Sequence, residues 1–320
     1  MKGYNTEIFM GIILAFLMAT VLSCSEEIDV ELPQPEKLHY SVEGFIEDGQ
    51  PPIILLTKTL AFTSVINIDT LINRFVSGAT MYITTEGTTY QLQEIKVKDL
   101  PPAIQKEIAT AFGFSDPEPI AELSFYTTRF TPLPELVGKA GNTYHLTIIS
   151  PDGKDTLTAT TYIPARKLKL DSLWTKSVND SMANMWAIYS DPPEIGDIVR
   201  YYTSINGGPF CAPFGGAIDD RYFNGATITI ELDRGVCNRQ DPEEYNPETF
   251  GLYHIGDTVV VKWCNIDEYQ YKFWLTFEGA LTAIDNPFAS PVRIESNVNG
   301  GYGIWGGSNC SFDTIVVNPN

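Results

Sequence analysis

The segment GNTYHLTIISPDGKDTLTATTYI, residues 141–163, decides the fold of this chain. In its first half, alternate residues from Tyr144 to Ile148 are apolar, the period expected of a strand that buries one face. The turn residues Pro151-Asp152-Gly153 then reverse the chain, and Leu157–Ile163 returns as a second β-rich run. The segment therefore predicts a β-hairpin, which we expect to close a β-sandwich.

Tyr144 carries a second signal, because it stands at the start of its strand directly after Gly141-Asn142-Thr143. This placement resembles the tyrosine corner of immunoglobulin-like and fibronectin-like sandwiches, in which the phenol bonds to nearby backbone. The alternative interpretation is a strand aromatic that only fills the core.

Two more hairpins are predicted upstream. Residues 38–46 lead through the turn Glu47-Asp48-Gly49 into residues 53–59, and residues 78–84 and 88–95 flank Glu86-Gly87. We therefore predict that residues 37–166 form an immunoglobulin/fibronectin-like β-sandwich domain.

One segment of that domain breaks the β pattern. The residues Asp99-Leu100-Pro101-Pro102 favour a helix start, because the fixed φ of proline suits the first turn. Ile104, Ile108 and Phe112 follow at four-residue spacing and would share one helix face. The sequence thus predicts a small inserted helix that ends near Gly113.

Residues 167–320 are richer in aromatic residues and loop signals, and we predict a second β-rich domain there. Ala226–Leu232 and Thr258–Cys264 have the alternating β-branched residues of strands. Beyond them, apolar residues recur every three or four positions from Ile266 to Ile284, with Asn265 as the predicted cap and Glu268 three residues later. We expect one covering helix near residues 266–284, and a mainly β fold class for the whole chain.

The N-terminal residues predict export and lipidation. The apolar run Gly11–Leu22 is too short to span a bilayer but has the length of a signal-peptide core, and it ends at Cys24. An aliphatic residue three places before a cysteine resembles the lipobox of bacterial lipoproteins, in which the cysteine thiol is acylated, for example with palmitate. We expect residues 1–23 to be the signal peptide and residues 24–36 the lipid anchor and tether; the alternative is an ordinary secretory signal with a chance cysteine.

The acidic pair Glu26-Glu27 follows the anchor cysteine. It resembles the surface-export signal of Bacteroidetes lipoproteins, although a chance pair is possible in a chain with 40 acidic residues. We predict a lipid-anchored protein of the cell outer membrane that faces the exterior.

The charge of the chain excludes one class of partner. Its 21 basic and 40 acidic residues give a formal net charge of -19, and no Lys/Arg cluster reverses the sign locally. Such a chain repels nucleic acid, so we predict no nucleic-acid partner.

Four cysteines lie in the second half of the chain, at Cys211, Cys237, Cys264 and Cys310. An even number in an exported chain predicts two disulfides. Three pairings are possible, of which we favour Cys211 with Cys237 and Cys264 with Cys310. A zinc site is the alternative, but the chain has no Cys-x-x-Cys pair.

Catalytic motifs are missing from the sequence. It contains no Gly-x-Ser-x-Gly elbow, no His-Glu-x-x-His pair, no glycine-rich phosphate loop and only three histidines. The segment Asp219–Gly225 has oxygen ligands before a glycine, as calcium loops do, but lacks their alternate ligand spacing and closing glutamate. We therefore predict no enzyme activity, no metal and no cofactor; a hydrolase that uses a pair of loop carboxylates is the least favoured alternative.

The glycine-rich segment near the C-terminal end is the most distinctive interior sequence. Asn297, Tyr302 and Trp305 lie in a run with five glycines between residues 300 and 307 and are our candidate contact surface for a ligand. The alternative interpretation is a glycine-bent strand whose aromatics fill the core.

Three stretches together suggest a family. They resemble a family of Bacteroidetes outer-membrane lipoproteins of unknown function, of the DUF4249 type. The stretches are residues 286–288 leading to 296–306, the opening 38–46 with 53–57, and the turn 223–225. Its members are often encoded beside TonB-dependent transporters. The resemblance implies an outer-membrane lipid contact through Cys24 and a β-barrel partner, and it supplies no catalytic residues.

From these observations we expect a surface-exposed outer-membrane lipoprotein that acts as a non-enzymatic accessory subunit of an outer-membrane β-barrel, such as a TonB-dependent transporter. The alternative is a free-standing surface lipoprotein that binds glycan or peptide.

Overall fold

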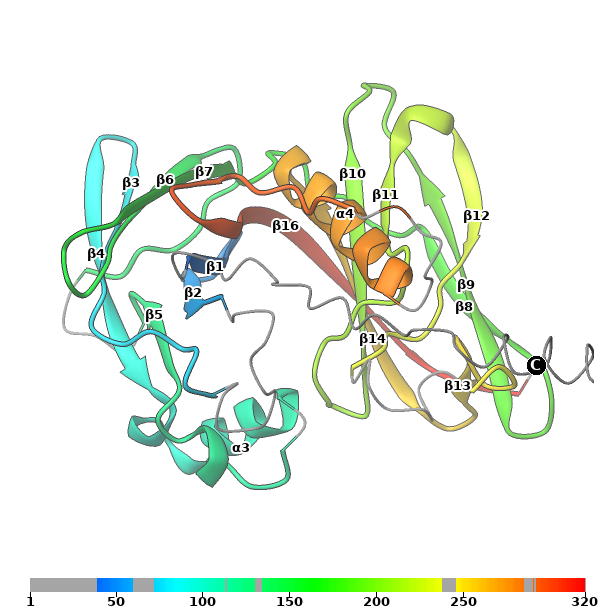
Figure 1. Ribbon diagram of the computed structural model, residues 1–320. Helices are drawn as coiled ribbons and strands as arrows, with labels where there is room; N and C mark the ends of the chain where they lie inside the picture. Colours follow the sequence, from blue (N-terminus) through cyan, green and yellow to red (C-terminus); the bar gives the residue numbers. More distant parts are fainter. Residues whose placement is uncertain are drawn as a thin grey trace, which may run out of the picture. The chain divides into compact units, whose positions relative to one another are not determined.

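A twelve-stranded sheet connects the two halves of the chain (Figure 1). The computed structural model describes residues 39–59, 72–112, 114–129, 134–237, 246–284, 290 and 292–319, all within the compact unit Lys37–Asn320. The predicted signal peptide, Cys24 and the predicted tether lie outside the described residues.

The strands of the large sheet come from both halves. They are β1 (Tyr40–Glu47), β2 (Ile53–Lys58), β3 (Thr80–Thr85), β4 (Thr88–Lys96), β5 (Ser124–Thr127), β6 (Thr143–Ile149), β7 (Thr156–Tyr162), β10 (Ile198–Ile205), β11 (Ala217–Asp219), β14 (Thr258–Ile266), β15 (Val298–Asn299) and β16 (Tyr302–Val316). Their spatial order is β11-β10-β14-β16-β1-β2-β5-β4-β3-β6-β7-β15. The predicted mainly β fold class is therefore confirmed.

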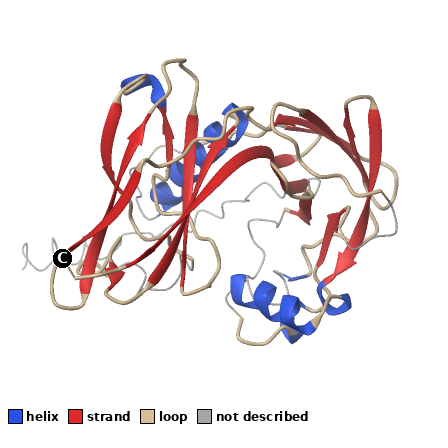
Figure 2. Cartoon of the chain, turned by 180° about the vertical axis from the view of Figure 1, so that it is seen from behind, coloured by secondary structure: helices blue, strands red, loops and turns tan. Residues whose placement is uncertain are grey.

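A smaller sheet belongs to the second half alone. Its strands are β8 (Ser172–Ser177), β9 (Met182–Ser190), β12 (Thr227–Glu231) and β13 (Tyr253–His254), with β9 in the middle. The described helices are α3 (Pro102–Ala111), α4 (Glu268–Ile284) and the short 3-10 turns η1 (Val97–Asp99), η2 (Glu118–Ile120) and η3 (Asp220–Tyr222). Figure 2 shows from behind how few helices accompany the strands.

β16 is the strand that joins the halves, and Figure 1 shows it running beside both β1 and β14. Its residues 302–308 pair in parallel with β1, and its residues 308–316 pair antiparallel with β14. Parallel pairing with β1 requires a strand that returns from far along the sequence. One long strand thus serves both parts of the sheet.

Two hydrophobic cores lie on the two sides of the boundary predicted at residue 166. The first is built from residues 40–163 together with Val298 and Trp305, and the second from residues 168–317. The sheet crosses that boundary, because β16 belongs to the second half and completes the first core. The two halves therefore share a strand as well as a chain connection.

The three predicted hairpins are confirmed. β1 pairs antiparallel with β2, β3 with β4, and β6 with β7. At the β3–β4 turn, Glu86 and Gly87 have φ values of 47° and 77°, which is the left-handed pair that a two-residue hairpin turn requires.

The tyrosine corner is also confirmed. The backbone N–H of Lys139 donates to the Tyr144 hydroxyl at 2.7 Å, and that hydroxyl donates to the Lys139 carbonyl oxygen at 3.3 Å. The Tyr144 ring itself is fully buried in the first core. One residue thus closes a backbone turn and fills the sandwich interior.

The inserted helix α3 occupies the predicted position, with Pro102 in its first turn. It lies over a small separate core in which Val97, Ala109, Ile120 and Leu123 are buried. In Figure 1 this part lies next to β5.

The long helix α4 is confirmed, but its predicted cap is wrong. Asn265 belongs to β14, because antiparallel pairing with β16 continues as far as Ile266. The helix begins at Glu268, and the Asp267 carboxylate accepts the backbone N–H of Gln270 at 2.7 Å. The capping function therefore falls to Asp267, two residues later than expected.

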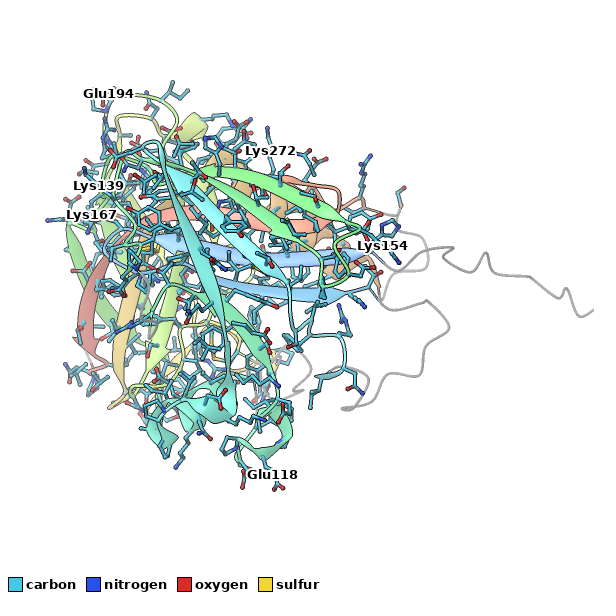
Figure 3. The ribbon with its side chains drawn as sticks, turned by 90° about the vertical axis from the view of Figure 1, so that its left-hand side faces the viewer. Glu118, Lys139, Lys154, Lys167, Glu194 and Lys272 are labelled. Carbon is cyan, nitrogen blue, oxygen red and sulfur yellow. A yellow bond between two sulfur atoms is a disulfide. The ribbon has the colours of Figure 1, made fainter. Side chains whose placement is uncertain are left out.

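Several charged side chains lie at the periphery. Figure 3 labels Lys139, Lys154, Lys167, Glu194 and Lys272, all on the outer surface. Among the described residues, no helix combines the length and the apolar character needed to cross a membrane.

Candidate functional site

A cavity of about 800 Å³ opens between β1, the α3 region and α4. Aromatic side chains from three separate parts of the chain dominate its walls: Phe75, Phe112, Phe114, Phe273, Trp274 and Phe277. We call it the aromatic groove. Its volume and its mostly apolar walls with a few polar groups are typical of ligand sites.

Helix α4 supplies one wall. Phe273, Trp274 and Phe277 lie within one turn of each other, so their rings meet on the same side of the helix. The Phe273 and Phe277 rings stack with centroids 5.7 Å apart, and Trp274 meets the edges of both at 5.0 and 5.9 Å. Such contacts fix ring positions before any ligand arrives.

Trp274 is held from two sides. The Phe45 ring of β1 stacks on it at 6.4 Å, and the Arg200 guanidinium lies 4.1 Å from the centre of its ring. Arg200 is 1% exposed and bonds through both terminal nitrogens to Glu278 Oε1, at 3.2 and 3.1 Å. The cation–π contact and the ion pair together anchor the α4 wall to β10.

The opposite wall comes from the segment around α3. Phe112 meets Phe75 edge to face at 6.3 Å, above the buried Ile120 and Leu123. Phe112 remains 42% exposed although it lies among apolar neighbours. Its free ring surface therefore faces the groove and is available to a partner.

Glu43 places a carboxylate in this apolar setting. It sits in the middle of β1, lines the groove, and has no hydrogen bond or ion pair with any described residue. The residue is solvent-exposed at the groove, and desolvation by the surrounding protein raises the pKa of its carboxyl. A mostly apolar groove whose acid Glu43 pairs with no described residue favours a ligand that carries a hydrogen-bond donor or a positive charge.

The three predicted contact residues do not form one surface. Trp305 is fully buried, and its indole N–H donates to the Tyr144 carbonyl oxygen at 3.1 Å. The Asn297 amide exchanges hydrogen bonds of 2.9 and 2.7 Å with the Trp305 backbone. Only Tyr302 is exposed, at 52%, where it lines the groove and meets the His39 ring edge-on. Trp305 therefore fits the alternative interpretation, a glycine-bent strand whose aromatic fills the core, whereas Tyr302 does not.

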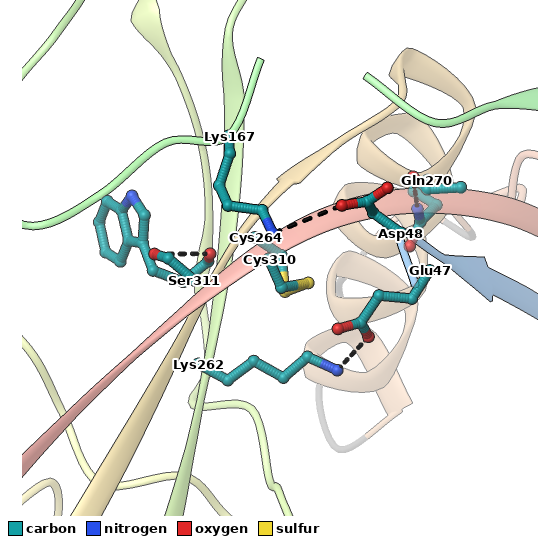
Figure 4. The surroundings of a disulfide bond; sticks show 10 residues. Glu47, Asp48, Lys167, Lys262, Cys264, Gln270, Cys310 and Ser311 are labelled. Carbon is teal, nitrogen blue, oxygen red and sulfur yellow. Dashed lines mark hydrogen bonds and ion pairs between the residues drawn. A yellow bond between two sulfur atoms is a disulfide. The ribbon is translucent and has the colours of Figure 1, made fainter. Parts of the chain in front are cut away.

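The predicted disulfides are present with the favoured pairing, Cys211 with Cys237 and Cys264 with Cys310. Cys264 and Cys310 stand directly opposite each other on β14 and β16 and are buried. Figure 4 shows this bridge near the ion pairs of Lys262 with Glu47 and of Lys167 with Asp48. The bridge links two neighbouring strands inside the large sheet.

The sequence predicted α4 as a helix that covers the second sheet, but not that its aromatic residues line a groove. Periodicity revealed the stripe, but the opposing Phe75 and Phe112 come from a different region. No local pattern indicates that these segments meet, because the contact depends on the order of strands in the sheet.

Comparison with known proteins gives a family and no function. No curated protein matches the chain. A family model described as "Domain of unknown function (DUF4249)" matches residues 25–311, which is most of the chain. The chain therefore belongs to this family of unknown function.

Proposed function

We propose that this protein is a lipid-anchored, non-enzymatic accessory subunit of an outer-membrane β-barrel, and that the aromatic groove holds an apolar polypeptide segment of its partner. The observation that carries the proposal is the groove itself, in which seven aromatic rings surround the Glu43 carboxylate, which pairs with no described residue. The anchor is the acylated Cys24 expected from the sequence.

The chemistry of the groove favours a polypeptide segment over a sugar. Sugars are recognised by many fixed hydrogen-bonding groups beside an aromatic face, whereas the walls here are mostly phenylalanine and aliphatic residues. Glu43 adds the specificity that apolar walls lack, because it pairs well with a lysine or arginine side chain of the incoming segment. The groove thus suits an apolar segment with one basic residue.

Membrane confinement makes a weak contact sufficient. Acyl chains contribute about 0.8 kcal/mol per buried methylene, so two or three of them hold a water-soluble body at the bilayer. The tether at residues 24–36 contains two prolines and gives the body reach. A subunit held beside its partner in this way gains effective concentration without extra contact area.

The test is copurification of the full-length protein from detergent-solubilised membranes. A stoichiometric β-barrel protein is expected with the wild type. Tyr302→Ala, which removes an exposed groove residue, and Glu43→Gln are expected to reduce its recovery at least several-fold.

Phe312→Ala is the matched control, because Phe312 is also on β16 and is 54% exposed but does not line the groove. Its recovery should equal that of the wild type. A monomer that retains sugar or peptide and no barrel would instead favour the free-standing binding protein. An unprocessed and unlipidated N-terminus, found by mass spectrometry, would remove the membrane part of the proposal.

A further inference from the structure

Three carboxylates meet at one end of the second half of the chain. Asp191 follows β9, Asp197 precedes β10, and Asp220 begins the turn η3. One oxygen of each residue lies within 4.8 Å of an oxygen of both others. The residues come from two loops that the sheet brings together.

The cluster is buried. Asp191 is 7% exposed and Asp220 is 1% exposed, and the Asp197 side chain is 11% exposed. Arg166 pairs with Asp197 at 2.6 Å but also bonds to Glu194 at 2.7 Å, so its single charge is shared. Buried anions at this spacing repel one another unless a further cation compensates them.

One oxygen in the cluster has no partner. Asp220 Oδ2 accepts the backbone N–H groups of Gly196 and Asp197, at 2.8 and 3.0 Å. Asp220 Oδ1 is buried and accepts no hydrogen bond in the described part of the chain. An unsatisfied buried carboxylate oxygen is costly, and a bound metal ion would satisfy it.

The other two carboxylates are already held in place. Asp191 accepts the Tyr189 hydroxyl at 2.9 Å and the Gly225 N–H at 3.0 Å. Asp197 accepts the Arg166 guanidinium at 2.6 Å and the Asn265 side-chain amide at 3.1 Å. These hydrogen bonds hold the three carboxylates close together although like charges repel one another.

We propose that Asp191, Asp197 and Asp220 bind a calcium ion. All the donors are oxygens, which hard divalent cations prefer, and calcium accepts flexible geometry with several ligands. A solvent-open cavity of about 570 Å³, lined by Arg166 and Glu194 among others, reaches the cluster at Asp197. Figure 3 shows Glu194 at the outer edge of the molecule.

The linear sequence concealed this site. Of the segment Asp219–Gly225, only Asp220 contributes a side-chain ligand, because the Asp219 carboxylate pairs with Arg221 at 2.8 Å. The other ligands come from the loop between β9 and β10, so the spacing of a continuous calcium loop is absent. This site does not depend on the proposed accessory function.

The test uses the mature full chain, stripped with a chelator and then titrated with calcium. Calcium is expected to raise the Tm of the wild type by several degrees, because a ligand that binds only the folded state stabilises it. Terbium is expected to give sensitised emission that calcium displaces, since the Tyr189 hydroxyl touches Asp191 and the Trp263 ring lies 5.3 Å from the Tyr189 ring.

Asp220→Asn should abolish the calcium-dependent shift and the terbium emission. In chelator, however, its Tm should equal or exceed that of the wild type, because a repulsive buried charge has gone. Asp219→Asn is the matched control: it removes a similarly buried neighbouring carboxylate, at 8% exposure, and should retain the calcium response.

The outcome for the wild type alone decides the proposal even if a variant fails to fold. An unchanged Tm in calcium, together with no displaceable terbium emission, would overturn it. An equal response to magnesium at the same concentration would overturn the assignment to calcium. Retention of the full shift in Asp220→Asn would place any bound ion elsewhere.

Discussion

Asp267 shows how much one buried carboxylate can organise. It caps α4 through Gln270, accepts the Thr161 hydroxyl of β7, and accepts the Gly307 N–H of β16 at 3.2 Å. Burial, as the largest influence, raises its pKa to about 6 despite these donors. The residue therefore links a helix to both halves of the sheet at the cost of a desolvated charge.

The first prediction concerns pH. The unfolded Asp267 carboxyl has its ordinary pKa of 3.8, so between that value and about 6 the folded protein binds the proton more tightly. The protonated carboxyl therefore contributes about 3 kcal/mol to the unfolding free energy at low pH. This contribution is lost as the pH rises through 6. Asp267→Asn lacks this charge, so the unfolding free energy of the wild type should fall relative to the variant between pH 4 and 7 in urea titrations.

The control for that comparison is Asp152→Asn. Asp152 lies in an exposed turn, and hydrogen bonds from Ser150 and Lys154 lower its pKa. The unfolding free energy of the wild type relative to this variant should not fall between pH 4 and 7. If the difference in unfolding free energy between the wild type and Asp267→Asn did not change with pH, the raised pKa of Asp267 would be contradicted.

Gly303 sets the second prediction. Its φ is +105°, and an added Cβ would lie 1.9 Å from the Val42 carbonyl oxygen. Gly303→Ala should therefore lower the unfolding free energy by more than about 2 kcal/mol, measured by chemical denaturation. Gly153→Ala offers a matched comparison: φ is +70° but no atom lies within 4 Å, so the loss should be only about 1 kcal/mol. Equal losses of unfolding free energy in the two variants would show that the cost at Gly303 comes from its positive φ and not from the clash with Val42.

At the scale of elements, local signals predicted local structure. The hairpins follow from alternation and turn residues, and α4 follows from its three- and four-residue periodicity, as the structure confirms. The cap of α4 was wrong because pairing with β16 extends β14 past Asn265. Pairing between strands that are distant in the sequence leaves no local sequence pattern. The parallel pairing of β1 with β16, and the groove that depends on it, were therefore not predictable from the sequence.

The third prediction concerns the two disulfides. Cys237 is exposed, whereas Cys264 and Cys310 are 1% and 4% exposed. Disulfide exchange needs access for the attacking thiolate. Brief treatment of the folded protein with reductant should therefore allow alkylation of Cys211 and Cys237 first, read by peptide mass spectrometry. Simultaneous labelling of all four cysteines would contradict the burial of the Cys264–Cys310 bridge.

At the scale of the whole Lys37–Asn320 unit, two cores depend on one strand. β16 completes the first core with Trp305 and pairs with β14 over the second. Neither core retains its full set of neighbours once this strand leaves the sheet. The two halves should therefore unfold together although their interiors are separate.

That coupling is the fourth prediction. Ile304 is fully buried in β16, and Ile304→Ala should lower the unfolding free energy by about 2–5 kcal/mol. Tryptophan fluorescence and the hydrogen exchange of β7 and β9 amides should report one common transition, with both halves shifted equally. Two separate transitions, or a shift confined to one half, would indicate independent folding units.

The late position of β16 has a consequence for biosynthesis. Because β16 follows all the other described strands in the sequence, a nascent polypeptide cannot pair β1 or β14 with it until those strands have been translated. A chain at that stage of synthesis has had no opportunity to complete the sheet. A translocation channel that accepts only unfolded substrates would receive such a chain in a competent state.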